Sequence, residues 1–203
     1  MIGSRTVAEA VRRGHVVDAY SRSGRTVESA DTSAALDLAD TAAVIDVIGR
    51  HDVTLIAAVS GRGGEMDQNV ADHRALIEAA PVGRLVVVGG AGALQADAQT
   101  RLKDTPDFPE QFRTEAQTFS DVLDLYRASE GLHWSMLAPA PMIAPGQRTG
   151  SYRTELDVPA GESISAEDFA VALVDEAESD AHAGRRFTVA TEPPGAGARV
   201  RRR

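Results

Sequence analysis

The stretch Leu85-Val86-Val87-Val88-Gly89-Gly90-Ala91-Gly92 constrains the fold more than any other part of the chain. Four consecutive apolar residues, three of them valine, run directly into a cluster of glycines. An uninterrupted run of this kind is typical of a strand buried on both faces, as in a parallel sheet covered by helices. Ligands of such sheets bind at the carboxyl ends of the strands. The stretch predicts a core strand that ends at a ligand-binding edge, and the alternative is a core strand followed by a plain turn.

The composition narrows the class of protein. The chain has 203 residues, 43% of them apolar, which suits one globular domain with a sizeable core. Its net charge of -9 argues against a nucleic-acid partner, and no apolar run is long enough to span a bilayer. It contains no cysteine, which excludes disulfides and fits a reducing compartment. We therefore expect a soluble, cytoplasmic protein that binds neither nucleic acid nor membrane.

Helical and extended patterns alternate through the first half of the chain. Gly14 ends the first predicted helix, and Asp40 or Thr41 caps the second. The predicted elements are a helix over 3–13, a strand over 16–20, a weak strand or loop before 37–40, a helix after it, a strand over 53–59, a flexible loop over 60–64 and a helix from 67 to Pro81.

The second half continues the alternation after an irregular stretch over 93–109. Apolar residues at helical spacing, from Phe119 to Tyr126, predict a helix, and Ser165 begins another. The remaining predictions are a strand over 132–138, a hairpin-like stretch over 149–158, a strand over 186–190 and a disordered, arginine-rich tail over 192–203. The pattern predicts an α/β three-layer sandwich with a mainly parallel sheet, in one domain over residues 1–191. The tail could contact a phosphate surface, although we favour a solvated tail.

The order of these elements resembles a known family. The chain is similar to the atypical short-chain dehydrogenases, NAD(P)-binding proteins that include NmrA-like proteins, biliverdin-reductase-B-like proteins and NADH-flavin reductases. The resemblance spans about residues 2–190. The matching pieces are Ile2-Gly3-Ser4, Arg22, 37–40, Val86 to Gly92, 104–109, Trp134 to Pro139, and Ile143-Ala144-Pro145-Gly146.

The main departure from the family lies at the beginning of the chain. Family members begin with a buried strand and a Gly-x-x-Gly-x-x-Gly loop, whereas Met1-Ile2-Gly3 corresponds only to the end of that loop. The first strand would lie between the second and fourth, so its absence leaves unpaired edges on both neighbours. We favour a start codon placed too far downstream, or a truncated chain. The alternative is a sheet completed by a partner.

The resemblance implies a dinucleotide cofactor, and particular residues for it. Arg22 lies where the 2′-phosphate of NADP would bind, so NADP is expected in preference to NAD. Ser21 and Ser23 would add hydrogen bonds, and Gly3 remains from the phosphate-binding loop. The other implied cofactor-binding residues are Asp37 and Leu38 near the adenine, Ala57 and Val59 near the ribose, and Gly89, Gly90 and Pro139 near the nicotinamide.

No catalytic residue is predicted. Ordinary short-chain dehydrogenases use a Tyr-x-x-x-Lys pair, but no lysine stands four residues after Tyr20, Tyr126 or Tyr152, and Lys103 is the only lysine. The sequence also lacks the spacings of a zinc site, a nucleophile elbow or a Walker loop. His133 is interpreted as structural, and Phe108 and Phe112 as loop packing rather than as a substrate pocket.

We therefore expect an NAD(P)H-dependent reductase of a flavin, a quinone or a similar small acceptor, because hydride transfer to such an acceptor needs little beyond positioning. The alternative is a non-catalytic NADP sensor that regulates a partner. A folded remnant that binds no cofactor is a third possibility. The protein would act as a monomer or a homodimer.

Overall fold

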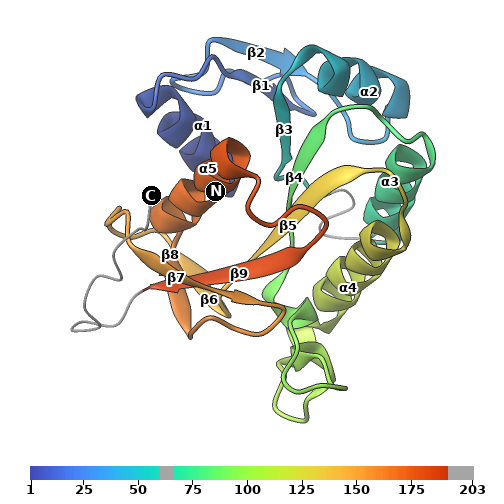
Figure 1. The fold of residues 1–203 in the computed structure, drawn as a ribbon, viewed down its shortest axis with the longest axis vertical. Coiled ribbons are helices and arrows are strands. Elements are labelled where there is room, and N and C mark those ends of the chain that lie inside the picture. Colours follow the sequence, from blue (N-terminus) through green and yellow to red (C-terminus); the bar gives the residue numbers. More distant parts are fainter. Residues whose placement is uncertain (60–65, 192–203) are drawn as a thin grey trace.

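The computed structural model describes residues 1–59 and 66–191. Helices cover both faces of parallel strands, as Figure 1 shows, so the predicted α/β three-layer sandwich is confirmed. The first half contains α1 (Ile2–Arg12), β1 (Asp18–Ser21), β2 (Thr32–Ala35), α2 (Thr41–Arg50), β3 (Val53–Ile56) and α3 (Asp67–Glu78). The second half contains β4 (Arg84–Val88), α4 (Arg113–Ala128), β5 (His133–Pro139), β6 (Met142–Ala144), β7 (Tyr152–Leu156), β8 (Ser163–Ser165), α5 (Ala166–Ser179) and β9 (Arg186–Thr191).

The largest sheet has the strand order β3-β4-β5-β9-β7. Its strands are parallel except β7, which runs antiparallel to β9. Residues 149–158 were expected to be hairpin-like, but β7 pairs with β9, with partners from Leu156↔Phe187 to Tyr152↔Thr191. That distant pairing has no local signal, because only tertiary packing brings the two strands together.

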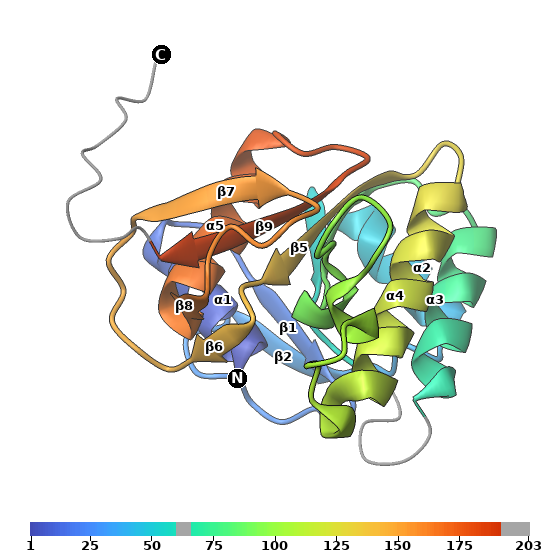
Figure 2. The ribbon, with the colours of Figure 1, turned by 90° about the horizontal axis from the view of Figure 1, so that it is seen from below.

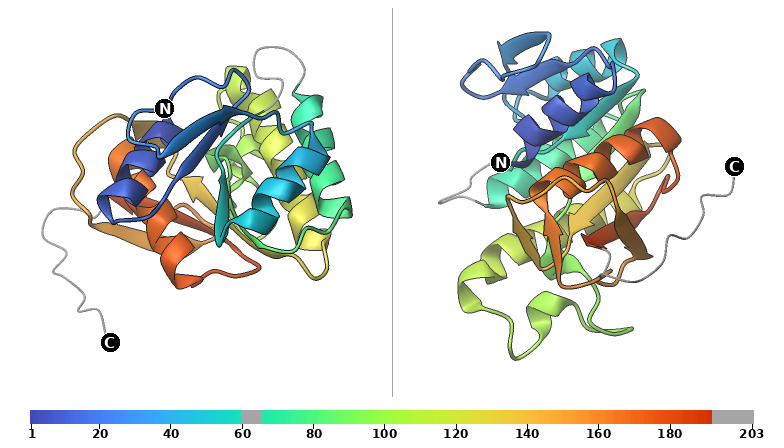
Figure 3. Two further views of the ribbon diagram at one scale, coloured as in Figure 1. Left: turned by 90° about the horizontal axis from the view of Figure 1, so that it is seen from above. Right: turned by 90° about the vertical axis from the view of Figure 1, so that its left-hand side faces the viewer.

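The helices form two outer layers. Figure 3 shows α1 and α5 together on one side of the sheet, and α2, α3 and α4 on the other. The core strand β4 is buried along most of its length, with Leu85, Val86 and Val87 at most 1% exposed. The strand predicted from the Leu85–Gly92 stretch is therefore confirmed.

A break divides the parallel strands. β1 pairs with β2 in a sheet of its own, and neither pairs with β3. In the described residues no strand lies between β1 and β3, which agrees with the expected gap between the second and fourth strands. His51 spans the two sides of this gap, because its Nε2 lies 2.9 Å from Oδ2 of Asp18.

Local capping explains several boundaries. Asp40 caps α2 by accepting a hydrogen bond from the amide of Ala43, and Ser165 caps α5 in the same way from Asp168. The irregular stretch after β4 contains three short 3₁₀ helices, over 91–93, 102–104 and 110–112. The predicted loop over 60–64 and the predicted tail over 192–203 lie outside the described residues.

Candidate dinucleotide-binding site

Parallel strands place their carboxyl ends at one edge of the molecule, and the predicted cofactor residues follow these ends. β1 and β2 are parallel in one sheet, and β3, β4 and β5 are parallel in the other, so the carboxyl ends within each sheet lie together. The residues at this edge are Ser21 at the end of β1 and Arg22 and Ser23 after it, Asp37 and Leu38 after β2, Ala57 and Val59 after β3, Gly89 and Gly90 after β4, and Pro139 at the end of β5.

Helix α1 begins at the same edge. A Cβ atom built on Gly3 would lie 4.0 Å from Cβ of Ala57, so the first turn of α1 adjoins the end of β3. No side chain caps this helix end, and its first turn contains no acidic residue. The amide groups of the first turn and the positive end of the helix dipole are therefore available to an anion such as a phosphate.

The residues after β1 include an unpaired cation. Arg22 is exposed and forms no ion pair or side-chain hydrogen bond within the part of the chain that the structure describes. The hydroxyl of Ser21 is buried without a hydrogen-bond partner, and that of Ser23 accepts a 3.4 Å hydrogen bond from the amide of Arg25. The free guanidinium and the unpartnered hydroxyl suit the binding of a phosphate or a ribose.

The residues after β2 have structural contacts of their own. Oδ1 of Asp37 accepts a hydrogen bond from the amide of Ala39, which stabilises the turn into α2. Leu38 packs against the core cluster beneath α2. Asp37 remains exposed after the end of β2.

β3 ends at Ile56, earlier than the strand predicted over 53–59. Ala57 is consequently exposed just beyond the strand, and Val59 is partly buried. Thr54, within β3, has a buried hydroxyl with no partner, like that of Ser21 in β1. Both unsatisfied hydroxyls belong to the strands that border the gap in the sheet.

The glycines after β4 have a packing role that the sequence did not reveal. A Cβ atom on Gly90 would lie 2.4 Å from the ring of Phe119, and one on Gly92 would lie 2.5 Å from Cβ of Ala116. Gly89 is less crowded, with Sδ of Met136 at 3.0 Å. Gly90 and Gly92 therefore allow α4 to pack closely against the end of β4.

Tyr126, Tyr152 and Lys103 each have another side chain as a partner. Tyr126 is buried beside His73, with its hydroxyl 3.2 Å from Nδ1, and burial raises the pKa of Tyr126 well above its usual value. Tyr152 donates a hydrogen bond to Asp175, and Lys103 forms an ion pair with Asp104. These contacts do not join Lys103 to Tyr126 or to Tyr152.

Phe108 has a packing partner, Phe112 is largely exposed, and His133 lies away from the carboxyl ends of the strands. The guanidinium carbon of Arg113 lies over the ring of Phe108, 5.9 Å from the ring centroid. Phe112 is 52% exposed. His133 forms a 2.7 Å contact with Asp180 at the opposite end of β5, as expected for a structural residue. The described residues contain no cluster of ligands suited to a metal ion.

The sequence did not reveal a network of ion pairs and hydrogen bonds that holds the segment after β6, residues 145–151. Glu9 is 5% exposed in α1 and binds Arg148 of this segment, as well as Arg12 and Arg13. Burial opposes ionisation of Glu9, but hydrogen bonds from the three arginines lower its pKa far below the ordinary value. Glu9 and Arg148 are 139 residues apart in the chain, so no local pattern could have revealed the contact.

The first turn of α5 holds the same segment. Glu167 accepts a hydrogen bond from the amide of Gly146, and Asp168 accepts hydrogen bonds from Thr149 and Gly150. Glu167 also pairs with Arg5, near the beginning of α1. The segment after β6 is therefore tied to the helix whose N-terminus lies at the cofactor edge.

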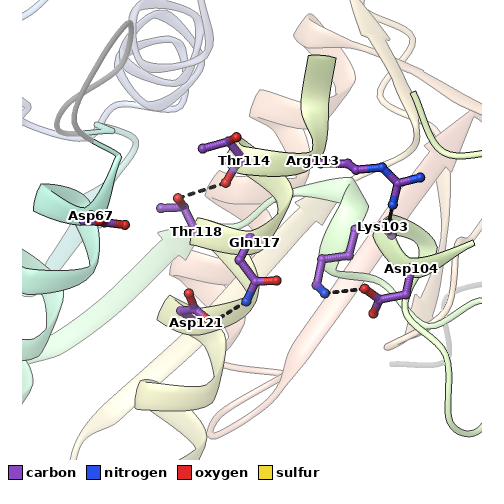
Figure 4. Close-up of a pocket in the computed structure, with 8 residues that line it drawn as sticks. All are labelled: Asp67, Lys103, Asp104, Arg113, Thr114, Gln117, Thr118 and Asp121. Carbon is purple, nitrogen blue, oxygen red and sulfur yellow. Dashed lines mark hydrogen bonds and ion pairs between the residues drawn. The ribbon is translucent and has the colours of Figure 1, made fainter. Parts of the chain in front are cut away.

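A separate open cavity of about 340 Å³ lies beside the first turns of α4. Figure 4 shows Asp67 of α3 on one side of it, and Lys103 and Asp104 on the other. It contains none of the predicted cofactor residues, and several of its polar groups bind one another, as do Gln117 and Asp121.

The fold and the edge described above define a Rossmann-like dinucleotide-binding protein. The family described as NAD(P)H-binding matches residues 1–180, and the chain belongs to this family. The Bacillus subtilis protein YwnB is 36% identical over 201 residues, covering 94% of this chain and 93% of that protein.

Two solved structures extend the comparison. A candidate exported protein from Burkholderia pseudomallei is 35% identical, with a TM-score of 0.83, over 94% of this chain and 95% of that one. A candidate NADH-flavin reductase from Streptococcus pneumoniae is 31% identical, with a TM-score of 0.78, over 94% of each chain. These likenesses agree with the expected resemblance to atypical short-chain dehydrogenases. No helix of the described residues is long and apolar enough to cross a membrane.

Proposed function

We propose that the protein is an NADPH-dependent reductase of a flavin, a quinone or a similar small acceptor. The observation that carries the proposal is the position of α1, whose first turn lies beside the end of β3 at the carboxyl edge of the sheet. Family membership supports the nicotinamide cofactor, and the likeness to a candidate NADH-flavin reductase supports the reaction class.

The preference for NADP over NAD rests on Arg22. Its guanidinium follows β1 and is not paired with a carboxylate in the described residues, so it is free to bind a 2′-phosphate. Ser21 and Ser23 lie beside it. The pyrophosphate would be held by the first amide groups of α1, where Gly3 leaves the backbone accessible.

The chain's contribution to the reaction is binding and orientation. The cofactor supplies the hydride when it is bound. The residues after β4 and β5, Gly89, Gly90 and Pro139, would border the nicotinamide and fix the face that it presents. Because Tyr126 and Tyr152 are engaged elsewhere, the reaction is assigned to an acceptor that needs no proton from a tyrosine-lysine pair.

The second candidate is a non-catalytic NADP sensor that regulates a partner protein. The absence of a Tyr-Lys pair favours it. We place either activity in the cytoplasm, since a chain without cysteine suits a reducing compartment. The same proposal includes a small-molecule acceptor as the substrate, and neither nucleic acid nor membrane as a partner.

A binding experiment tests the role of Arg22. Arg22→Glu should weaken NADPH at least tenfold more than NADH, because the substitution places a carboxylate beside the 2′-phosphate. Arg25→Glu is the matched control, since Arg25 is exposed in the same loop and carries the same charge. Equal loss of NADPH and NADH in the Arg22 variant would disprove the assignment.

A turnover experiment separates the two candidate functions. The purified chain is mixed with NADPH and with FMN or a quinone, and oxidation of NADPH is followed by its absorbance. The reductase proposal predicts turnover that Arg22→Glu lowers. Tight binding of NADPH without turnover on any acceptor would instead support the sensor.

A further inference from the structure

Strand β7 forms the outer boundary of the five-stranded sheet. It pairs with β9 on one side only, and in the described residues no strand pairs with its other side. Figure 2 shows β7 at the periphery of the molecule. Four of its five residues are exposed, from Arg153 to Leu156. Such an edge exposes backbone donors and acceptors that a further strand could bind.

The side chains of this edge carry opposite charges around a central residue. Arg153 and Glu155 flank Thr154, and the period of two places both on the same face of the strand. Both are exposed, and neither forms an ion pair or a side-chain hydrogen bond in the part of the chain that the structure describes. Leu156 and Val158 add apolar surface, with exposures of 45% and 40%.

Other strands that end a sheet lack this pattern. The sequence of β3 is Val-Thr-Leu-Ile and that of β2 is Thr-Ser-Ala-Ala, neither of which contains a charge. The sequence of β1 contains only Asp18. Among the described strands at sheet boundaries, β7 alone combines a cation and an anion on one face.

Symmetry restricts how two copies of β7 could pair. Side chains that are opposite each other in an antiparallel pair point to the same face of the sheet, so a residue can lie opposite only a residue that is an even number of positions away. In a symmetric pair, the two-fold axis therefore lies midway between one residue and its own copy, and we call this an axis through that residue. An axis through Arg153 would place two arginines opposite each other, and an axis through Glu155 would oppose two glutamates. An axis through Thr154 places Arg153 opposite the partner's Glu155 and Glu155 opposite the partner's Arg153.

We propose that β7 is the interface of a symmetric homodimer, paired antiparallel to the partner's β7 about an axis through Thr154. The two five-stranded sheets then form one continuous sheet. Two Arg-Glu pairs lie across the axis, and Tyr152 lies opposite the partner's Leu156. The occupant is a second copy of this chain because the edge is complementary in charge to itself, as a two-fold interface requires.

Charge reversal tests the interface. Sedimentation velocity of the full chain, from about 1 to about 100 µM, should show a concentration-dependent dimer. Arg153→Glu or Glu155→Arg should each weaken the dimer at least tenfold, because two like-charge pairs replace two attractive ones. The combined Arg153→Glu and Glu155→Arg variant should restore it. Arg74→Glu, which reverses an exposed charge on α3, should have no effect.

A cysteine at the axis provides a second test that does not depend on affinity. The chain contains no cysteine, so Thr154→Cys introduces one thiol per protomer. Opposed residues of an antiparallel pair have Cα atoms about 4.5–5.5 Å apart, within the range of a disulfide. With oxidised glutathione, Thr154→Cys should form disulfide-linked dimers at least tenfold faster than Arg74→Cys.

Several results would overturn the proposal. A chain that remains monomeric over the whole concentration range, with equal cross-linking rates for the two cysteine variants, excludes the interface. A dimer that both single reversals leave intact lies on another surface. A combined variant that stays monomeric while the single reversals dissociate excludes pairing about Thr154. Circular dichroism of each variant verifies that the fold is retained.

Discussion

Replacement of Gly90 by alanine tests whether the glycines after β4 serve packing. The new Cβ would lie 2.4 Å from Cδ2 of Phe119 and 3.0 Å from its Cβ, so α4 must move and not only the ring. Overpacking of this kind costs about 1–3 kcal/mol. The backbone of Gly90 is extended, with φ of -119°, so alanine fits it and gains about 0.4–1 kcal/mol by restricting the unfolded chain. The expected net loss is about 1–2 kcal/mol.

Gly89→Ala is the matched control for this substitution. Its Cβ would meet Sδ of Met136 at 3.0 Å, and the end of a flexible thioether can move aside. The gain in the unfolded state then roughly offsets the contact, and stability should change by less than about 0.5 kcal/mol. The neighbouring substitutions therefore differ in expected stability although both add a single methyl group.

Urea denaturation followed by circular dichroism measures the difference. Gly90→Ala should unfold at a lower midpoint with an unchanged m-value, and its melting temperature should fall by about 2–8 °C. Equal stability of the two variants would refute the packing argument. NADPH titration of folded Gly90→Ala adds a separate reading, since a loss of affinity beyond about tenfold would support the proposed position of Gly90 beneath the nicotinamide.

Three further predictions concern titratable groups. Glu9→Gln should lower the free energy of unfolding by about 2–3 kcal/mol in denaturant titrations at pH 7, because it leaves three arginines without their buried carboxylate, and the loss should shrink as the pH falls below about 4.5. Burial lowers the pKa of His73 to about 4, so stability should fall by roughly 3 kcal/mol as acidification proceeds from about pH 6.5 to pH 4; thermal melts of His73→Gln should lack this dependence. Hydrogen bonds to the carbonyl of Val47 and to Asp18 raise the pKa of His51, so the stability that the charged His51 adds is lost as the pH rises through the raised pKa. Thermal melts across this pH range should show a smaller loss of stability for Asp18→Asn than for the unchanged chain.

The sequence by itself determined the class of fold. The buried run from Leu85 to Val88 and the alternation of helical and extended patterns predicted a parallel sheet between helices, because burial on both faces requires continuous apolar strands. Capping chemistry at Asp40 and Ser165 predicted helix starts that the structure confirms, because a cap forms between residues three positions apart.

The sequence also predicted several residues that stand at or just after the ends of the parallel strands. Strand ends are visible locally, and parallel topology then places all of them at one edge, including Arg22 and Pro139. What each residue contacts was not visible. The crowding of Gly90 by Phe119 and the packing of Leu38 against the core depend on neighbours that only the folded chain supplies.

Only the tertiary structure decided the contacts between residues that are distant in the sequence. It pairs β7 with β9 and not with a neighbouring strand, and it brings Arg148 to Glu9 across 139 residues. It also leaves Arg153 and Glu155 together on an edge with which no other described strand than β9 pairs. Hydrophobic periodicity and capping act over a few residues, so they specify the elements. Strand order and long-range ion pairs follow from how those elements pack, which no short stretch of sequence records.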